Sequence, residues 1–156
     1  ILNKISQINE RLSLYNIIIH SDNIKELEVF NSFSHLPLSI ENSDARKEFG
    51  RTVKDIKNIL DNSNLNLTLD LQHCYVNDNT MKLADDFYKE FSNKIVEFHV
   101  SGYDENLDHY TLYKTKQDII IDFLKNKTQP IILESVYDNL NEAELEIEYV
   151  KNRLLN

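Results

Sequence analysis

Five short apolar runs alternate with segments of helical periodicity, and this alternation limits the fold more than any other feature of the sequence. The runs expected to form strands cover residues 16–20, 37–41, 66–71, 95–100 and 130–135. The segments expected to form helices cover residues 4–15, 24–30, 44–60, 79–91, 115–127 and 141–155. Within 44–60, Phe49, Val53 and Ile56 recur at spacings of three and four residues, and Asp44 is the expected cap. Apolar strands separated by helices indicate a parallel sheet covered by helices.

The size and composition are those of an ordinary globular protein. With 156 residues, 41% hydrophobic and 28% charged, residues 1–156 are expected to form a single domain. No apolar run approaches the roughly 20 residues of a membrane span, so no membrane partner is expected. The single cysteine, Cys74, excludes an internal disulfide framework and a cysteine-based zinc site. It fits a reducing, cytoplasmic location, and we expect its side chain to fill space in the core.

The charge and the loops restrict the class of ligand. A net charge of −9 argues against nucleic acid as a partner, although a metal cluster can create local positive charge in an acidic chain. No glycine-rich phosphate-binding loop follows any of the expected strands, which argues against the nucleotide-binding α/β folds. The alternative α/β architecture is a barrel, in which active-site residues lie at the carboxyl ends of the strands.

Every expected strand finishes on or next to a residue that binds metals well. These residues are His20, Glu41, Asp70, His99 and Glu134, and the loops after the third and fourth strands add His73 and His109. A single acid that ends a strand caps the next turn or helix more often than it binds a metal. Taken together, side chains at the carboxyl ends of parallel strands would converge on one rim of a barrel. Carboxylates mixed with imidazoles, without thiolates, suit Mn²⁺, Zn²⁺, Co²⁺ or Fe²⁺. His35 is not at a strand end, and we expect it to lie at the surface or to serve packing.

The order of these motifs resembles a known superfamily. The segments "SIENSD", "LDLQH", "EFHVSG" and "IILES", with "IIIH" ahead of them, are similar to the C-terminal part of the xylose-isomerase-like TIM barrels. This superfamily includes sugar isomerases, sugar epimerases and endonuclease IV, and the resemblance covers about residues 15–155. It implies an α/β, parallel TIM-barrel fold of about five βα units. Since a full barrel has eight units and about 250 residues, a longer chain or a second subunit would supply the remainder.

The resemblance implies different roles for the same residues in different branches. In the epimerases, Glu41, Asp70, His99 and Glu134 would bind one divalent ion, and Glu41 and Glu134 would also exchange protons next to a metal-polarised carbonyl. His73 would then bind substrate, as would His109 near the same rim. The predicted activity is that of a sugar or sugar-phosphate isomerase or epimerase. In the endonuclease IV branch, the four ligands would join His20, His73 and His109 around three zinc ions that hydrolyse a phosphodiester in DNA.

Some features fit neither branch completely. The endonuclease branch expects Asp-x-His after the fourth strand, whereas Asp108 and His109 are adjacent here, and the epimerases usually have an arginine that "SGYDENLDHY" lacks. A non-catalytic, incomplete barrel module is the third alternative. Just beyond Glu41, three basic residues would bind a substrate phosphate or carboxylate, or else form a solvated first helical turn: Arg46, Lys47 and Arg51.

Overall fold

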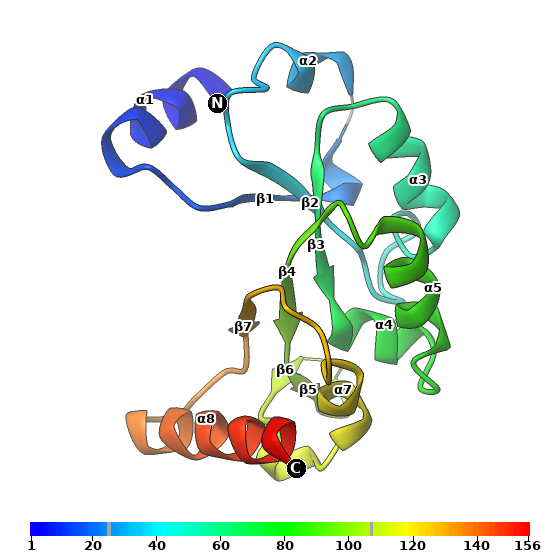
Figure 1. Ribbon diagram of the computed structural model, residues 1–156, viewed down its shortest axis with the longest axis vertical. Coiled ribbons are helices and arrows are strands. Elements are labelled where there is room, and N and C mark those ends of the chain that lie inside the picture. The colour runs from blue at the N-terminus through cyan, green and yellow to red at the C-terminus, as the bar shows by residue number, and fades with distance from the viewer. Residues whose placement is uncertain (25, 107) are drawn as a thin grey trace.

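A computed structural model describes residues 1–24, 26–106 and 108–156 (Figure 1). Its main sheet has five parallel strands in the order β1-β2-β3-β4-β7. They are β1 (Ile17–His20), β2 (Leu38–Glu41), β3 (Asn66–Asp70), β4 (Ile95–Val100) and β7 (Ile131–Leu133). Each strand lies beside the preceding one of this sheet, as in the wall of a barrel. The predicted parallel α/β architecture is confirmed.

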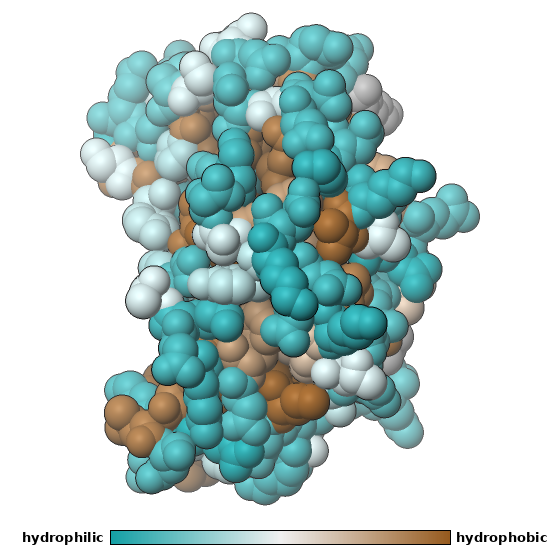
Figure 2. All heavy atoms as spheres, turned by 45° about the vertical axis from the view of Figure 1, so that its right-hand side comes forward, coloured by the Kyte–Doolittle hydropathy of each residue, from teal (hydrophilic) through white to brown (hydrophobic). Residues whose placement is uncertain are grey.

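The two faces of the sheet differ sharply in polarity, because side chains alternate along each strand. One face carries Leu67, Leu69, Phe98 and Val100, which belong to the buried apolar core. Helices cover this face, including α3 (Val53–Asp61), α5 (Lys82–Phe91) and α7 (Asp118–Phe123), and the ring of Phe98 contacts those of Tyr88 and Phe123. The outer surface on the side of α3 and α5 is mainly hydrophilic (Figure 2).

The opposite face of the sheet is polar on the central strands β2, β3 and β4, and it carries the residues that end the strands. The register places Thr68 beside Glu97 and Asp70 beside His99, so that these four side chains point to the same side. Likewise His20 pairs with Glu41 at the ends of β1 and β2. Parallel pairing in register therefore assembles the polar residues at the end of the sheet where the strands finish, here called its carboxyl end.

The helix expected over 44–60 begins only at Val53. The Thr52 hydroxyl accepts a hydrogen bond from the Asp55 amide, and the Asp55 carboxylate accepts one from the Thr52 amide, which together form a capping box. Gly50 adopts a left-handed φ of 84°, and a Cβ at this position would lie 1.9 Å from Ser21 Oγ. The segment before Thr52 is therefore a tight loop, and Asp44 accepts hydrogen bonds from Arg46 instead of capping the helix.

Several elements were not expected from the sequence. Helix α4 (Leu71–Asn77) follows β3 without a loop, and its cap is Asp70, whose carboxylate accepts a hydrogen bond from the His73 amide. A two-stranded antiparallel pair, β5 (Gly102–Tyr103) and β6 (His109–Tyr110), follows β4. The helix expected over 115–127 is replaced by α6 (Leu112–Thr115) and α7.

The remaining helices lie near the two ends of the chain. Helix α1 (Leu2–Leu12) precedes β1, the 3₁₀ turn η1 (Ser21–Asn23) follows it, and α8 (Leu140–Leu155) ends the chain. The helix expected over 24–30 includes residue 25, which lies outside the described residues, and α2 (Glu28–Asn31) occupies its last part. No helix in the described part of the chain is long and apolar enough to cross a membrane.

The sheet has two open edges, at β1 and β7. The side chains of Ile18 and Ile132 are 37% and 43% exposed at these edges. Apolar side chains on edge strands with unpaired backbone groups are normally covered by another element.

Candidate metal centre

Four side chains, from the ends of four neighbouring strands, meet at the carboxyl end of the sheet. Glu41, Asp70, His99 and Glu134 each offer one potential ligand atom, and these atoms lie within 4.8 Å of one another. His99 Nδ1 is 2.8 Å from Glu41 Oε1 and 2.9 Å from Glu134 Oε1. Glu134 follows the last residue of β7, and its amide donates a hydrogen bond to the Val100 carbonyl, which ties it to β4. Such a set of oxygen and imidazole donors is suited to a divalent transition metal.

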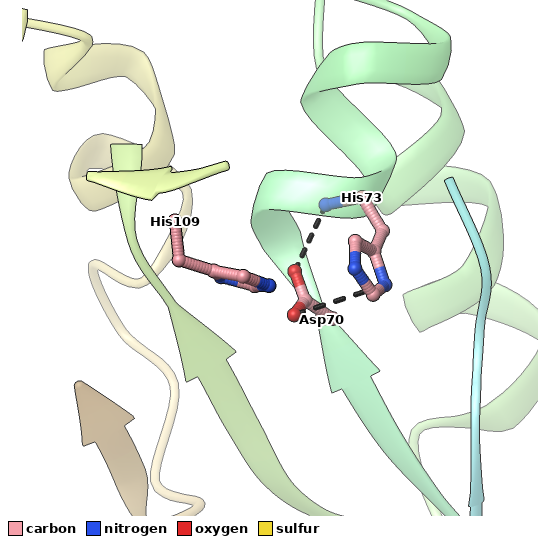
Figure 3. A group of neighbouring side chains, drawn as sticks. All are labelled: Asp70, His73 and His109. Atoms are coloured by element: carbon pink, nitrogen blue, oxygen red, sulfur yellow. Dashed lines mark hydrogen bonds and ion pairs between the residues drawn. The ribbon is translucent and has the colours of Figure 1, made fainter. Parts of the chain in front are cut away.

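A second group of potential ligands shares Asp70 with the first. It consists of Asp70, His73 and His109, whose ligand atoms again lie within 4.8 Å of one another. The ring of His109 points towards Asp70 from β6, and His73 approaches from the first turn of α4 (Figure 3). The two imidazole rings are in edge contact, with centroids 5.6 Å apart. Asp70 thus lies between two adjacent clusters of donor atoms.

Local hydrogen bonds orient both histidines of this second group. His73 Nδ1 lies 2.8 Å from the Asn42 carbonyl oxygen, which can only accept, so Nδ1 carries the proton and Nε2 is left for a ligand. His109 Nδ1 lies 2.8 Å from Ser101 Oγ, which can accept the Nδ1–H in the same way. Hydrogen bonds of this kind fix the ring orientation in metal sites.

Among the carboxylates of the site, Asp70 is the one that is poorly compensated by neighbouring groups. Asp70 is 1% exposed, and among the described residues its Oδ2 atom accepts no hydrogen bond and faces His73 Nδ1, 3.8 Å away. Burial, together with the nearby Glu41 carboxylate, raises the pKa of Asp70 to about 6 despite the opposing effect of His73. A buried carboxylate oxygen that accepts no hydrogen bond is costly. A cation at this position would remove that cost, so the residues present fit a bound metal.

Imidazole groups supply positive charge next to the carboxylates of the site. Burial alone would lower the pKa of His99, but its hydrogen bonds to Glu134 and Glu41 outweigh burial and raise the pKa to about 10. Burial likewise opposes protonation of His73, and the Asp70 and Glu41 carboxylates raise its pKa nonetheless. Burial alone would raise the pKa of Glu134, but the hydrogen bond from His99 and the nearby imidazole charges together lower it. A proton on His99 therefore occupies the place where a metal ion would neutralise the same carboxylates.

His20 lies beside the first group without belonging to either cluster in the described part of the chain. Its Nδ1 is 3.1 Å from Glu41 Oε2, and its side chain is 65% exposed. Glu41 therefore contacts His99 with one oxygen and His20 with the other.

The basic residues predicted to bind substrate divide into two sets. Arg46 and Lys47 line a cavity of about 730 Å³ together with His20, Glu41, His73, His109 and Glu134. Both are already paired, Arg46 with Asp44 at 2.6 Å and Lys47 with Asp22 at 2.6 Å. Arg51 does not line this cavity, because the turn at Gly50 directs the chain away and the Arg51 side chain contacts Asn77 Oδ1 at 3.3 Å.

The other two sequence predictions concern residues outside the centre. His35 is exposed and lies 2.8 Å from Ser6 Oγ, in agreement with a surface position. Cys74 is completely buried in the core, and burial raises the pKa of its thiol well above the usual value. Both predictions are confirmed.

Sequence reasoning missed the residue that joins the ends of β2 and β3. The Asn42 side chain accepts a hydrogen bond from the Asp70 amide at 2.7 Å and donates one to the Asp70 carbonyl at 3.0 Å. These two bonds continue the strand pairing past Glu41 and hold the Asp70 backbone in place. An asparagine directly after a strand-ending glutamate was the available signal.

Comparison with known proteins shows what this architecture is similar to. No family model and no curated protein matches the sequence. Among solved structures, endonuclease IV from Thermus thermophilus matches with a TM-score of 0.70 and 15% identity, over 94% of this chain and 64% of that protein. The chain has the fold of part of an endonuclease IV barrel. It therefore spans just under two thirds of the length of this structural neighbour, and at 15% identity the likeness extends to the fold alone.

Proposed function

We propose that this chain carries a divalent metal centre of more than one ion, which hydrolyses a phosphodiester bond. The observation behind this proposal is the sharing of Asp70 between two adjacent groups of donor atoms. A single-ion isomerase needs only the first group, whereas two ions held close together clamp both sides of a phosphoryl group. The likeness in fold to endonuclease IV supports the proposal of phosphodiester hydrolysis. On this basis we propose DNA as the substrate and zinc as the metal.

The residues of the two donor groups would all be metal ligands, and Glu134 would in addition act on the reacting water. Glu41, Asp70, His99 and Glu134 would hold one ion, and Asp70, His73 and His109 would hold the other. The bound ions would lower the pKa of a water molecule and polarise the phosphoryl oxygens. Glu134 is the least buried of the three acids, so it is the one placed to accept a proton from that water.

Two basic side chains at the mouth of the cavity would contact an anionic substrate, although each is already paired with an aspartate. Arg46 pairs firmly with the buried Asp44 but reaches the exposed Asp108 only at 3.4 Å. Exposed ion pairs contribute little stability, so a phosphate oxygen can replace Asp108 as the partner of the guanidinium. Lys47 lies on the same rim and is half exposed. These contacts would bind the phosphate despite the acidic net charge of the chain.

Metal stoichiometry and activity together test this proposal. The full-length protein is stripped with a chelator, titrated with Zn²⁺, and analysed for bound zinc and for cleavage of a DNA duplex with an abasic site. We expect at least two ions per chain and metal-dependent cleavage. His109→Ala should lose one ion and the cleavage, because His109 belongs only to the second group. The matched control, His35→Ala, alters an exposed histidine elsewhere and should change neither. One ion per chain without cleavage would refute the proposal.

An isomerase or epimerase is the second candidate, and a different observation favours it. Glu41 and Glu134 approach the same His99 nitrogen at 2.8 and 2.9 Å, so two carboxylates flank one ion position. Such a pair suits proton removal and return next to a carbonyl of a sugar or sugar phosphate. For this activity, Glu134→Gln should lower turnover about 10²–10⁴-fold while weakening metal binding only in part. Exchange of the substrate's α-proton with solvent at the wild-type rate in this variant would exclude Glu134 as the base.

The open edges of the sheet indicate how the barrel is completed. We propose that further βα units cover β1 and β7, supplied by a longer chain or a second subunit, because Ile18 and Ile132 are exposed there. The neighbouring structure is also longer than the part matched by this chain. If the full-length protein binds zinc but shows neither activity, the alternative of a non-catalytic barrel module is favoured.

A further inference from the structure

The polar face of the sheet continues below the metal ligands, where a barrel interior is usually filled by bulky apolar side chains. Ser39, Thr68 and Glu97 occupy this level on β2, β3 and β4, each two residues before a potential metal ligand. All three are buried, and Glu97 is only 4% exposed. A buried carboxylate in this position requires a specific partner, because ionised groups are rarely buried unpaired.

A hydrogen-bond network holds Glu97 in one orientation. Asn16 Nδ2, just before β1, donates to Glu97 Oε1 at 2.8 Å and also to Thr68 Oγ1 at 3.0 Å. Ser39 Oγ lies 2.8 Å from Thr68 Oγ1 and extends the network to β2. The partners on this side are all neutral. They fix the position of the carboxylate without neutralising its charge.

The charged partner of Glu97 is the imidazole of His99. The Nε2 atom of His99 lies 3.4 Å from Glu97 Oε1, and in the described part of the chain His99 is the one basic group within ion-pair distance of Glu97. The other nitrogen, Nδ1, faces Glu41 and Glu134. The ring therefore stands between the ion position on one side and the Glu97 carboxylate on the other.

We propose that Glu97 is a positioning residue for the metal centre: it accepts the Nε2–H of His99 and so directs Nδ1 at the ion. This inference rests on the metal site proposed above. A carboxylate on the second nitrogen fixes the tautomer and ring orientation and makes the imidazole a stronger donor. Asn16 contributes indirectly, because it holds the carboxylate under the ring.

Metal affinity provides the first test. Binding of Zn²⁺ and Co²⁺ to the full-length protein is measured by competition with a chromophoric chelator at pH 7.5. Glu97→Gln keeps the size of the side chain but removes its charge, and we expect affinity to fall about 10–100-fold, as for other carboxylates behind metal-binding histidines. Glu90→Gln is the matched control, because it makes the same chemical change at an exposed glutamate of α5 that is paired with Lys57 and lies outside the network. It should bind both metals like the wild type.

A spectroscopic measurement on the wild type does not depend on how well a variant folds. In the zinc-loaded protein with ¹⁵N-labelled histidine, the His99 Nε2–H should appear as a downfield, slowly exchanging proton, and Glu97→Asp should shift it. Equal metal affinity of Glu97→Gln and wild type, or an Nε2–H that exchanges rapidly in the wild type, would overturn the role of Glu97. Failure of the wild type to bind either metal would instead refute the proposed function.

Discussion

Replacing Asp70 with asparagine should stabilise the metal-free protein while removing its response to metal. Asp70 belongs to both donor groups, and among the described residues no other side chain is common to the two. Asparagine has nearly the same shape and caps helices as well as aspartate does, so the hydrogen bond from the His73 amide can be kept. The substitution therefore isolates the effect of the charge.

The size of the effect follows from the pKa of Asp70 in the folded chain. Burial raises this pKa from 3.8 to about 6, which corresponds to about 3 kcal/mol against the ionised carboxylate at neutral pH. Because the folded-state pKa of this acid is raised, the folded chain binds the proton more tightly than the unfolded chain does. The penalty is thus complete above about pH 6 and disappears as the pH falls towards 4. Asp70→Asn should gain up to about this amount at pH 7.5 and almost nothing near pH 4.

Urea unfolding followed by circular dichroism measures this difference. With a chelator at pH 7.5, the variant should have the larger free energy of unfolding. With Zn²⁺ at about 100 times its dissociation constant, the wild type should gain about 2.7 kcal/mol, and the variant should gain far less. Asp85→Asn makes the same chemical change at an exposed position of α5 and serves as the control.

Two outcomes would refute this reasoning. A chelator-treated Asp70→Asn protein that is less stable than the wild type at pH 7.5 would show that protonated histidines already compensate the carboxylate. A stability difference that is the same at pH 7.5 and pH 4.5 would show that the effect does not come from the charge of Asp70.

Three further predictions test other parts of the structure. Metal binding should release protons and should strengthen as the pH rises from 6 to 9. The reason is that the pKa of His99 is raised to about 10, so the ion must displace a proton from this ring. Titration calorimetry in buffers of different ionisation enthalpy measures the proton release. Thr52→Ala should remove the cap of α3 and lower the free energy of unfolding by about 1 kcal/mol, without changing zinc stoichiometry, and urea unfolding with metal analysis checks both. Arg46→Ala should raise the KM for a phosphodiester substrate at least about tenfold, because Arg46 lines the cavity. The metal content should not change, because Arg46 is in neither donor group. Steady-state kinetics at saturating Zn²⁺ tests this prediction.

Local patterns in the sequence were sufficient for the order and type of the main elements. Short apolar runs such as 66–71 and 95–100 predict parallel strands because they alternate with segments of helical periodicity, and the structure has these strands at Asn66–Asp70 and Ile95–Val100. The position of Glu41, Asp70 and His99 at strand ends was also visible, since parallel strands carry their carboxyl ends to one edge. Periodicity alone, however, overestimated the helix over 44–60, because a capping box and a left-handed glycine outweigh apolar spacing.

The tertiary structure decided which groups became neighbours and what each of them could bind. The pairing of β5 with β6 returns His109 to the carboxyl end of the sheet. Arg46 meets Asp108, and Lys47 meets Asp22, only because loops far apart in the sequence come together. Glu97 is read from the sequence only as an acid within an apolar run, and its contact with Asn16 spans 81 residues. Spacing along a strand determines the face on which a side chain lies, whereas the distance between two strands depends on the packing of the whole sheet. The identity of the strand-end residues is therefore local information, and the metal centre that they form is not.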